Sequence, residues 1–539
     1  MSQPQSDLEH ENEAIGALIS ASTEGGLCIK LRVPSEQIHI GQPMIVEGQT
    51  YKFYCLIERL EYPPDPQVTN LANSPFREQF LPMDTVDAAL PRRQAIASLT
   101  PLAIIPQEGA EESLEADTIP PYHCPVRPAT REDLRIVYRE TETSRSAGHL
   151  PGFPDFEVPI DLKELVSLPF GTFGKTGAGK TIFELVLAGN ILHAGVAQLV
   201  VIDPHGSFGY RSRTPDRTPG LKFFFPEQVT VIALDPGRMK DADYRLIMDA
   251  NELRVADLIM MMQDLSEPMI RALYTIDDVR NREKGVSLIS AVLDASDDFL
   301  KAHDIHKGVF RGLRDRLAHL RRFAFVQEQA SKKSQEVFLN DLPGLLKAGQ
   351  SLVFSLGEYA EDLSARLLLA NVLGRRLDRW YRADEDNSLP RLVFILEEAH
   401  LFLSGEIAQY TVFGKLIRES RKFRIVLAIV DQMPDEIPQK ILSQVSTRFV
   451  LRLEDVDDIR AAIARKVDPK QWYPILRRMP KRQVFAVGDA VAVPTIFTVQ
   501  EYREDLMAQK WGVNTAGRDA VAHLSSDQIA NALRGEKSN

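Results

Sequence analysis

The chain has 539 residues, and its 64 Lys and Arg against 75 Asp and Glu give a formal net charge of −11. This length excludes a small scaffold with a single hydrophobic core and predicts two or three domains. The acidic balance excludes a surface that coats nucleic acid indiscriminately, so any DNA site has to be local.

The cysteine content and the hydropathy of the chain bear on its environment. Cys28, Cys55 and Cys124 form no C-x-x-C motif, and their odd number leaves one unpaired in any disulfide scheme. No apolar stretch approaches the ~18 residues of a membrane-spanning helix, and the N-terminus is polar and acidic. We therefore expect a soluble cytoplasmic protein without a membrane segment.

The N-terminal part is predicted to be a polar tail followed by a small β-barrel. Residues 1–12 are polar, and residues 13–128 alternate short apolar runs with turn residues. The apolar runs are 15–19, 27–31, 43–46 and 51–57. Pro63–Pro66 and the acidic residues between 108 and 115 are interpreted as exposed loops, and residues 129–160 as a polar linker.

Residues 161–515 are predicted to form an α/β domain with a central parallel sheet. Strand and helix patterns alternate, and four short, nearly continuous apolar runs are typical of strands buried on both faces. The four runs are 198–202, 351–356, 392–396 and 425–430. Further strand patterns at 448–453 and 483–493, the second turning at Gly488–Asp489, are expected to extend this sheet.

Two parts of the chain depart from this alternation. Residues from about 245 to 345 lack strong strand patterns and have helical spacing, which predicts a helical insertion. Its basic residues are interpreted as an exposed helix face in preference to a DNA contact, and they are Lys307, Arg311, Arg314, Arg316, Arg321 and Arg322. Residues 516–539 form a polar tail with a weak amphipathic helix at 518–534.

A phosphate-binding loop is the strongest motif in the chain. Residues 174–181 match G-x-x-x-x-G-K-[ST] between an apolar segment and a helical pattern. They are Gly174, Lys175, Thr176, Gly177, Ala178, Gly179, Lys180 and Thr181. Such glycines let backbone N–H groups turn toward the β-phosphate, while Lys180 supplies charge to the β and γ oxygens and Thr181 a hydroxyl to Mg²⁺. The motif predicts a nucleotide site with a magnesium ion.

Polar residues at the ends of two predicted strands are candidates for hydrolysis. Glu397 and Glu398 directly follow the run 392–396, which places two carboxylates at the carboxyl edge of the sheet. We predict that Glu397 holds the water shell of Mg²⁺ and that Glu398 polarises the attacking water. Gln432 follows the next strand and is the candidate sensor of the γ-phosphate. His400 is either a solvated histidine or a residue that supports these groups.

Three further positions are candidates for the same site. Asp203 closes the strand 198–202, where it either faces the nucleotide or forms a turn before Pro204. Arg418 and Arg421 belong to a basic cluster just ahead of the last of the four strands. In a ring assembly one of them would reach the γ-phosphate of the adjoining subunit, and their spacing does not choose between them.

Together these motifs resemble the HerA family of the HerA/FtsK clade of ATPases over nearly the whole chain. The similar segments, besides the barrel, are Phe173–Thr181, Ile202–Gly206, Glu397–His400, Arg418–Phe423, Leu442–Arg448 and Val487–Val491. The resemblance implies a RecA-like P-loop ATPase core behind an N-terminal HAS-type barrel. It further implies a homo-hexameric ring, a helicase or translocase that hydrolyses ATP with Mg²⁺ and moves double-stranded DNA through its central pore.

The resemblance also implies a partner, a NurA-type nuclease that docks on the barrel face and takes part in DNA end processing. Three positions depart from the family pattern. Glu397 stands where aspartate is usual, Ser207 where glutamate is frequent, and Asp431–Pro434 replaces Ser/Thr-Gln-Arg-Pro. The longer side chain of Glu397 still reaches Mg²⁺ through water, so we expect slower or altered hydrolysis and not its absence.

Two other functions fit the same sequence. HerA-like ATPases also pair with nuclease or sirtuin-like effectors, which would make this chain part of an antiphage defence complex. Alternatively, the chain is an assembly scaffold in which nucleotide sets the state of the ring and a partner protein supplies the activity. A protein-secretion or conjugation ATPase is disfavoured, because the sequence contains no membrane segment.

Overall fold

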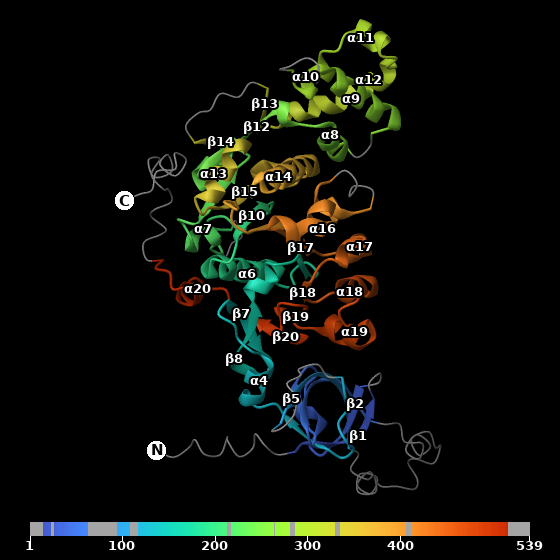
Figure 1. The fold of residues 1–539 in the computed structure, drawn as a ribbon, viewed down its shortest axis with the longest axis vertical. Helices are drawn as coiled ribbons and strands as arrows, with labels where there is room; N and C mark the ends of the chain where they lie inside the picture. Colours follow the sequence, from blue (N-terminus) through green and yellow to red (C-terminus); the bar gives the residue numbers. More distant parts are fainter. Residues whose placement is uncertain are drawn as a thin grey trace, which may run out of the picture.

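The computed structural model describes residues 14–22, 26–62, 94–107, 117–212, 217–262, 265–280, 286–328, 335–405 and 411–515. It consists of a barrel, a sheet flanked by helices, and a group of helices beyond the sheet (Figure 1). The predicted tails at 1–12 and 516–539, and the predicted loops at 63–66 and 108–115, lie outside these residues. No helix in the described part is both long enough and apolar enough to cross a membrane.

Six strands near the N-terminus close into the predicted barrel. They are β1 (Gly16–Ser22), β2 (Gly26–Leu31), β3 (Pro43–Glu47), β4 (Tyr51–Glu61), β5 (Ile96–Pro106) and β6 (Pro125–Pro128), in the order β1-β2-β5-β4-β3-β6. Closure comes from the pairing of β1 with β6. The inward-facing apolar residues, among them Leu18, Ile29 and Met44, form a core separate from that of the sheet.

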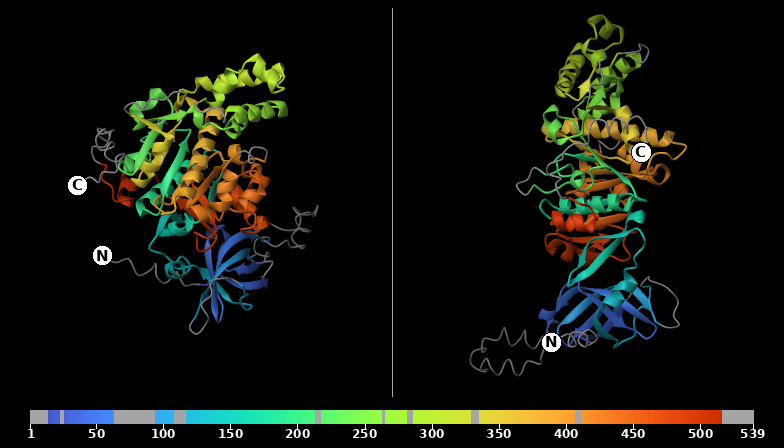
Figure 2. Two further views of the ribbon diagram at one scale, coloured as in Figure 1. Left: turned by 45° about the horizontal axis from the view of Figure 1, so that its top comes forward. Right: turned by 90° about the vertical axis from the view of Figure 1, so that its left-hand side faces the viewer.

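Buried hydroxyl groups join this barrel to the rest of the chain. The hydroxyl of Tyr54 in β4 lies 3.0 Å from that of Tyr138, which lies 2.7 Å from Oγ1 of Thr495. All three side chains are buried, and buried polar groups are costly to leave unpaired, so this network holds the barrel against one end of the sheet. Figure 2 shows the barrel at this end in two further views.

The sheet contains 14 strands within the described residues. They are β7 (Ser144–Leu150), β8 (Phe153–Asp161), β9 (Phe170–Phe173), β10 (Gln198–Asp203), β11 (Val229–Ala233), β12 (Tyr244–Asp249), β13 (Val326–Gln327), β14 (Glu336–Phe338), β15 (Ser351–Ser355), β16 (Leu392–Glu397), β17 (Ile425–Asp431), β18 (Thr447–Val450), β19 (Gln483–Val487) and β20 (Thr495–Val499). β10, β15, β16 and β17 correspond to the four predicted runs, and they pair in parallel.

The strand order explains where the functional loops meet. The central order is β10-β16-β17-β9-β18, so β17 lies between the strand that leads into the P-loop and the strand that ends in Glu397. Every residue of β16 and β17 is buried, which is why both strands are apolar at almost every position. The α/β core with a RecA-like P-loop arrangement is therefore confirmed.

Helices accompany the sheet along the chain. They are α4 (Arg131–Val137), α5 (Leu162–Leu165), α6 (Lys180–Ala194), α7 (Leu221–Phe224), α8 (Val255–Met261), α9 (Glu267–Arg280), α10 (Leu288–Leu293), α11 (Asp297–Ala302), α12 (Lys307–Ala318), α13 (Leu342–Lys347), α14 (Leu363–Ala383), α15 (His400–Leu403), α16 (Phe413–Phe423), α17 (Gln439–Leu442), α18 (Val456–Ile463), α19 (Pro469–Arg478) and α20 (Glu504–Lys510). Trp511, which follows α20, is buried against α6 and donates a hydrogen bond of 3.0 Å to Asn190.

The stretch interpreted as a polar linker, 129–160, is instead structured. It contains α4 and the hairpin of β7 and β8, and β7 pairs with β20 to extend the sheet. β8 is the last strand on this side, and its first five residues are exposed or half-buried. Because an edge strand keeps one solvated face, its composition resembles that of a linker when only the sequence is considered.

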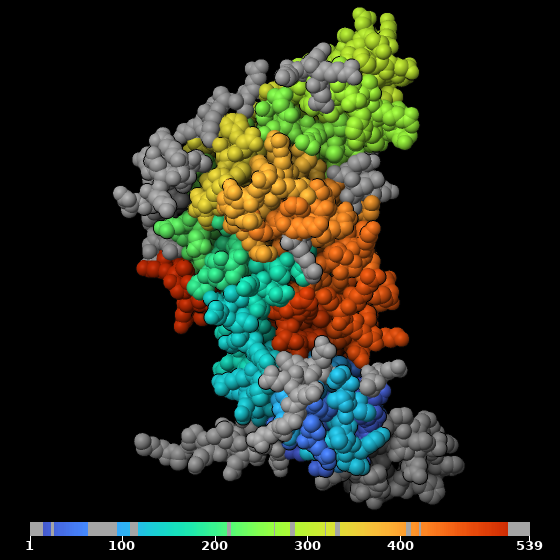
Figure 3. Space-filling model, viewed as in Figure 1, coloured from blue at the N-terminus to red at the C-terminus, as the bar shows by residue number. Residues whose placement is uncertain are grey.

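Two other expectations also need correction. The predicted insertion contains α8 to α12, which Figure 3 shows beyond the sheet at the end opposite the barrel. The same segment also adds β12 and its short partners β13 and β14, which are too short for hydrophobic periodicity to reveal. The strand predicted at 483–493 ends at Val487, and the returning strand begins only at Thr495, because Ala490 is held by hydrogen bonds to Asp161 and Thr447.

Candidate nucleotide site

The P-loop connects β9 to α6 and has the backbone that a phosphate cradle requires. Gly177 and Gly179 have φ of 75° and 111°, a region that residues with a side chain rarely adopt. A Cβ atom on Gly174 would lie 2.8 Å from Cβ of Leu451, so the loop also needs glycine there for space. α6 begins directly at Lys180, which directs the unpaired N–H groups of its first turn toward the loop.

A pocket of about 520 Å³ lies over this loop, a volume suited to a nucleotide. Lys180 donates a hydrogen bond to the carbonyl of Gly174. A phosphate oxygen in the cradle would compete with this carbonyl for the ammonium of Lys180. Burial lowers the pKa of the Lys180 ammonium, while the carboxylates of Glu184 and Asp431 oppose this shift. Thr181 lines the same pocket, so its hydroxyl is available to a metal ion.

Both predicted acidic residues, Glu397 and Glu398, lie in this pocket. Glu397 is the last residue of β16 and is buried, and one of its carboxylate oxygens has no hydrogen-bond partner among the described residues. Burial raises its pKa well above the usual value, and the charge of Glu184 adds to this effect. Glu398 follows with φ of 52°, and its carboxylate pairs with Arg366. An arginine therefore holds the carboxylate of Glu398, whereas Glu397 keeps an oxygen without a hydrogen-bond partner among the described residues.

The residues present fit a magnesium ion that is shared with nucleotide. Mg²⁺ prefers oxygen ligands and is usually held by one or two carboxylates together with substrate phosphates. Glu397 offers an unpaired buried oxygen, and Thr181 offers a hydroxyl at the start of α6. Among the described residues, no group of three or more His, Cys, Asp or Glu side chains could hold a metal ion alone.

Asp431 connects the acidic loop to the candidate sensor. Its buried carboxylate accepts hydrogen bonds from the backbone N–H of His400 at 2.6 Å and from those of Gln432 and Met433 at 2.6 and 2.8 Å. Nδ1 of His400 lies 3.0 Å from the same carboxylate, and this hydrogen bond raises the pKa of His400. His400 is thus a half-buried supporting residue. Gln432 lines the pocket and accepts a hydrogen bond from Thr176 of the P-loop.

Comparison with known proteins shows that the chain is similar to helicases. The family described as "Helicase HerA, central domain" matches residues 146–377, which include the P-loop and most of α14. The DNA double-strand break repair helicase HerA of Pyrococcus furiosus is 23% identical over 458 residues, which cover 76% of this chain and 80% of that protein. The helicase of the same name from Sulfolobus acidocaldarius is 24% identical over 403 residues, 73% of this chain and 76% of that protein. The chain is therefore similar to HerA helicases over about three quarters of its length.

With the P-loop inside the matched segment, the chain is a P-loop ATPase. The matched family segment ends at residue 377, so Glu397, Glu398 and Gln432 lie beyond it and their assignment rests on the pocket. Among solved structures, VirB4 of Thermoanaerobacter pseudethanolicus has a TM-score of 0.47 and 12% identity, and the match covers 68% of this chain and 99% of that chain.

One predicted nucleotide contact, Asp203, lies at the end of β10 but does not line this pocket. Its two carboxylate oxygens accept hydrogen bonds from the backbone N–H groups of Ser207 and Phe208, at 2.9 and 2.8 Å. These bonds engage the side chain in its own turn, and the neighbouring His205 lines the pocket instead. The structure thus places Asp203 in the turn-forming role, the second of the two alternatives.

The two predicted arginines lie on α16. The side chain of Arg418 is exposed and lines a separate cavity of about 650 Å³, together with residues of α17. It does not contact the pocket of its own chain, which is the placement required of a residue that acts on a neighbouring subunit. The side chain of Arg421 lies outside what the structure describes. Arg424, from the same basic cluster, instead pairs with Asp384 at 2.6 Å.

Three elements add pocket residues that the sequence analysis missed. Glu184 lies one helical turn after Lys180 and is buried, and burial raises its pKa to about 8. Its spacing of four residues from Lys180 is a signal that the sequence does contain. Arg366 comes from α14 and reaches the pocket only through its ion pair with Glu398, whereas Lys481 and Arg482, which precede β19, line the pocket directly. These three cations are remote in sequence, and only tertiary packing brings them to the P-loop.

Proposed function

We propose that this P-loop ATPase is a HerA-type motor that moves double-stranded DNA. The pocket supports the proposal, because one cavity collects the P-loop, the carboxylate of Glu398 and the amide of Gln432. These are the groups that bind a triphosphate, orient water and sense the γ-phosphate. The similar proteins of Pyrococcus furiosus and Sulfolobus acidocaldarius are both named as DNA double-strand break repair helicases.

Each pocket residue has a distinct part in the proposed hydrolysis. Lys180 and the first N–H groups of α6 bind the β- and γ-phosphates and neutralise charge that develops in the transition state. Thr181 and Glu397 would hold the magnesium ion, which supplies further charge neutralisation when bound. Glu398 orients and polarises the attacking water, and Gln432 contacts the γ-phosphate. Arg366 and Asp431 keep Glu398 and Gln432 in position.

The position of Arg418 supports a ring assembly. An exposed guanidinium on α16 that misses its own pocket can supply the planar, delocalised charge that suits a γ-phosphate in a neighbouring subunit. We propose that six copies of the chain form this ring, and that duplex DNA occupies its central pore. The barrel, a closed unit with its own core, serves as the module on which a NurA-type nuclease or another effector docks.

Duplex DNA is expected to raise the rate of ATP hydrolysis severalfold, since the proposed motor couples turnover to DNA movement. The stimulation is expected to weaken as salt rises, because contacts with DNA phosphates release counterions. Phosphate release should be measured with and without duplex DNA at several salt concentrations, alongside light scattering for subunit number. Intact hexamers with turnover that DNA does not change would contradict the motor and favour a nucleotide-controlled scaffold.

Mixing two inactive variants is expected to restore turnover. In a ring of Lys180→Ala and Arg418→Ala subunits, some interfaces combine an intact P-loop with an intact Arg418 from the neighbour. Each variant alone lacks one of the two at every interface, so both should be inactive and the mixture active. Arg460→Ala, an exposed arginine on α18, is the matched control. If Arg418→Ala retains full activity, the same mixing with Arg421→Ala decides whether that residue acts instead, and activity in both variants refutes a role for either.

A further inference from the structure

A second charged cavity lies apart from the nucleotide pocket. Its volume is about 630 Å³, and none of its lining residues lines the nucleotide pocket. Six arginines surround it, from the start of α8, the end of α9 and the second half of α14, and they are Arg254, Arg280, Arg375, Arg376, Arg379 and Arg382. Only two carboxylates, those of Glu252 and Asp378, belong to the same lining. The cavity therefore carries an excess of positive charge.

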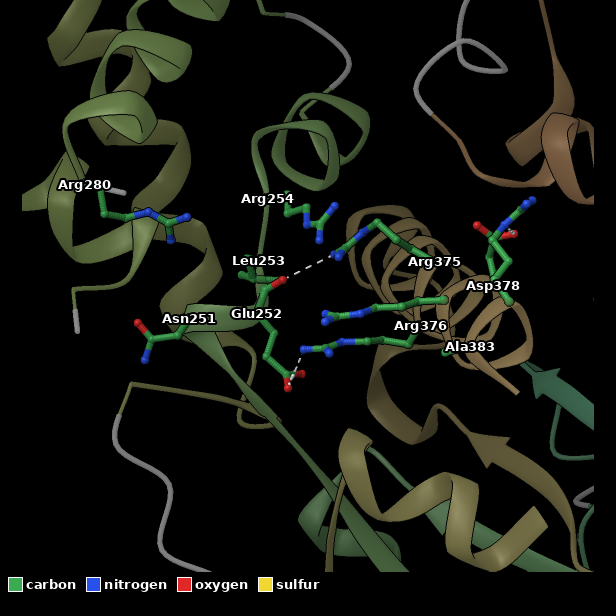
Figure 4. Close-up of a pocket in the computed structure, with 11 residues that line it drawn as sticks. Asn251, Glu252, Leu253, Arg254, Arg280, Arg375, Arg376, Asp378 and Ala383 are labelled. Atoms are coloured by element: carbon green, nitrogen blue, oxygen red, sulfur yellow. Dashed lines mark hydrogen bonds and ion pairs between the residues drawn. The ribbon is translucent and has the colours of Figure 1, made fainter. Parts of the chain in front are cut away.

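Two of the arginines are fixed by carboxylates behind the cavity wall. Arg375 pairs with the fully buried carboxylate of Asp257 and donates to the carbonyl of Glu252 at 3.3 Å. Arg376 pairs with the carboxylate of Glu252 at 2.6 Å. Figure 4 shows both side chains extending from α14 toward residue 252. Such ion pairs hold guanidinium groups in one orientation and lower the entropy that a bound anion would have to remove.

Two other arginines have no such partner. The guanidinium groups of Arg254 and Arg379 are exposed, and neither forms a hydrogen bond or ion pair with any residue that the structure describes. Partial burial, and after it the neighbouring charge of Arg375, lower the pKa of Arg254, while the charge of Asp257 opposes this shift. Arg280 pairs with Asp277 and Arg382 with Asp378, both at 2.7 Å. The charge that remains uncompensated is thus on Arg254 and Arg379.

Buried polar atoms around the cavity also lack partners. The Nε atoms of Arg375 and Arg376 and one carboxylate oxygen of Glu252 are buried and form no hydrogen bond within the described residues. Natural proteins rarely leave buried donors unsatisfied, and water or a polar ligand usually completes such a site. Several guanidinium groups around one cavity suit an anion with more than one charged group, because each planar fork can bind phosphate through two parallel hydrogen bonds.

We propose that this cavity is a second anion site, which binds phosphate groups of a ligand other than the hydrolysed nucleotide. Arg375 and Arg376 form its fixed wall, and Arg254 and Arg379 close on the ligand. The phosphates belong either to a free polyphosphate compound or to the backbone of nucleic acid, and both sources present the same chemistry to the arginines. The site goes beyond the proposed motor, since it requires neither hydrolysis nor movement along DNA.

A double variant, Arg254→Gln with Arg379→Gln, tests the proposal in the full-length chain. Both side chains are exposed, so the substitutions remove no side-chain hydrogen bond or ion pair among the described residues, and the melting temperature is expected to be nearly unchanged. The matched control is Arg271→Gln with Arg460→Gln, two exposed arginines in surface ion pairs outside the cavity. The double variant and the control both also carry Lys180→Ala. Loss of the P-loop lysine then weakens phosphate binding at the nucleotide pocket to the same extent in the two proteins.

Two probes distinguish the sources of phosphate. Titration calorimetry with inorganic tripolyphosphate is expected to show affinity at least about tenfold lower in the double variant than in the control if the ligand is a free polyphosphate. Anisotropy with a short DNA duplex is expected to show weaker binding, and a slope of log affinity against log salt reduced by about 1 to 2, if the ligand is nucleic acid. Equal affinities of variant and control for both probes would overturn the proposal.

Discussion

Replacing Lys180 with alanine is expected to lower the rate of ATP hydrolysis by about 100-fold or more, the scale of losing one preorganised charge from a transition state. Lys180 is the cation at the start of α6, and its ammonium donates a hydrogen bond to the P-loop carbonyl of Gly174. Alanine would also remove the positive charge that Glu184 and Asp431 stabilise against burial at this position. Phosphate release at saturating ATP is the direct measurement.

The control for this substitution lies in the same loop. Lys175 is half-buried at the rim of the pocket and pairs with Glu454, so Lys175→Ala removes a lysine of the P-loop without removing the charge next to α6. We expect Lys175→Ala to retain most of the activity, because surface ion pairs contribute little. Thermal unfolding of both variants should show that each is folded. Equal turnover in Lys180→Ala and the unmodified chain would refute the assignment of the pocket.

Replacing Glu398 with glutamine is expected to leave ATP binding nearly unchanged and to lower turnover by about 100- to 10,000-fold, the range for removing a general base. Glutamine has the shape of glutamate, and its amide oxygen can still accept the hydrogen bond from Arg366. What disappears is the negative charge that polarises the attacking water. Binding should be measured with a fluorescent ATP analogue, and turnover by phosphate release in single-turnover conditions.

Glu454→Gln is the matched control for Glu398→Gln. Glu454 is a glutamate near the P-loop, but its side chain is exposed and pairs with Lys175. Its replacement is expected to affect neither binding nor turnover by more than a small factor. If Glu398→Gln hydrolyses ATP as fast as this control, another group polarises the water, and the buried Glu397 becomes the next residue to substitute.

Local chemistry explains which parts of the site could be predicted. The P-loop consists of eight consecutive residues, and the spacing of its glycines, lysine and threonine is the signature of a phosphate cradle. No contact with a distant segment is needed to recognise it. β16 and β17 are buried on both faces, so their unbroken apolar runs locate the edge where Glu397, Glu398 and Gln432 emerge. Because the carboxyl ends of neighbouring parallel strands lie together, the sequence predicts that these three residues share one site.

The parts that could not be predicted depend on contacts between distant segments. Arg366 meets Glu398 across 32 residues, and Arg482 donates its backbone N–H to Ala178 across more than 300. The edge hairpin of β7 and β8 resembled a linker because only one face of an edge strand is buried.

The sequence by itself determined that this protein is a P-loop ATPase with an α/β core and a barrel, since motif spacing and hydrophobic runs are local properties. Only the tertiary structure decided that Asp203 serves its own turn, that Glu184 lies buried beside Glu397, and that six arginines surround one cavity. These outcomes follow from which side chains share a buried space, and burial and charge proximity are set by packing between elements far apart in the chain.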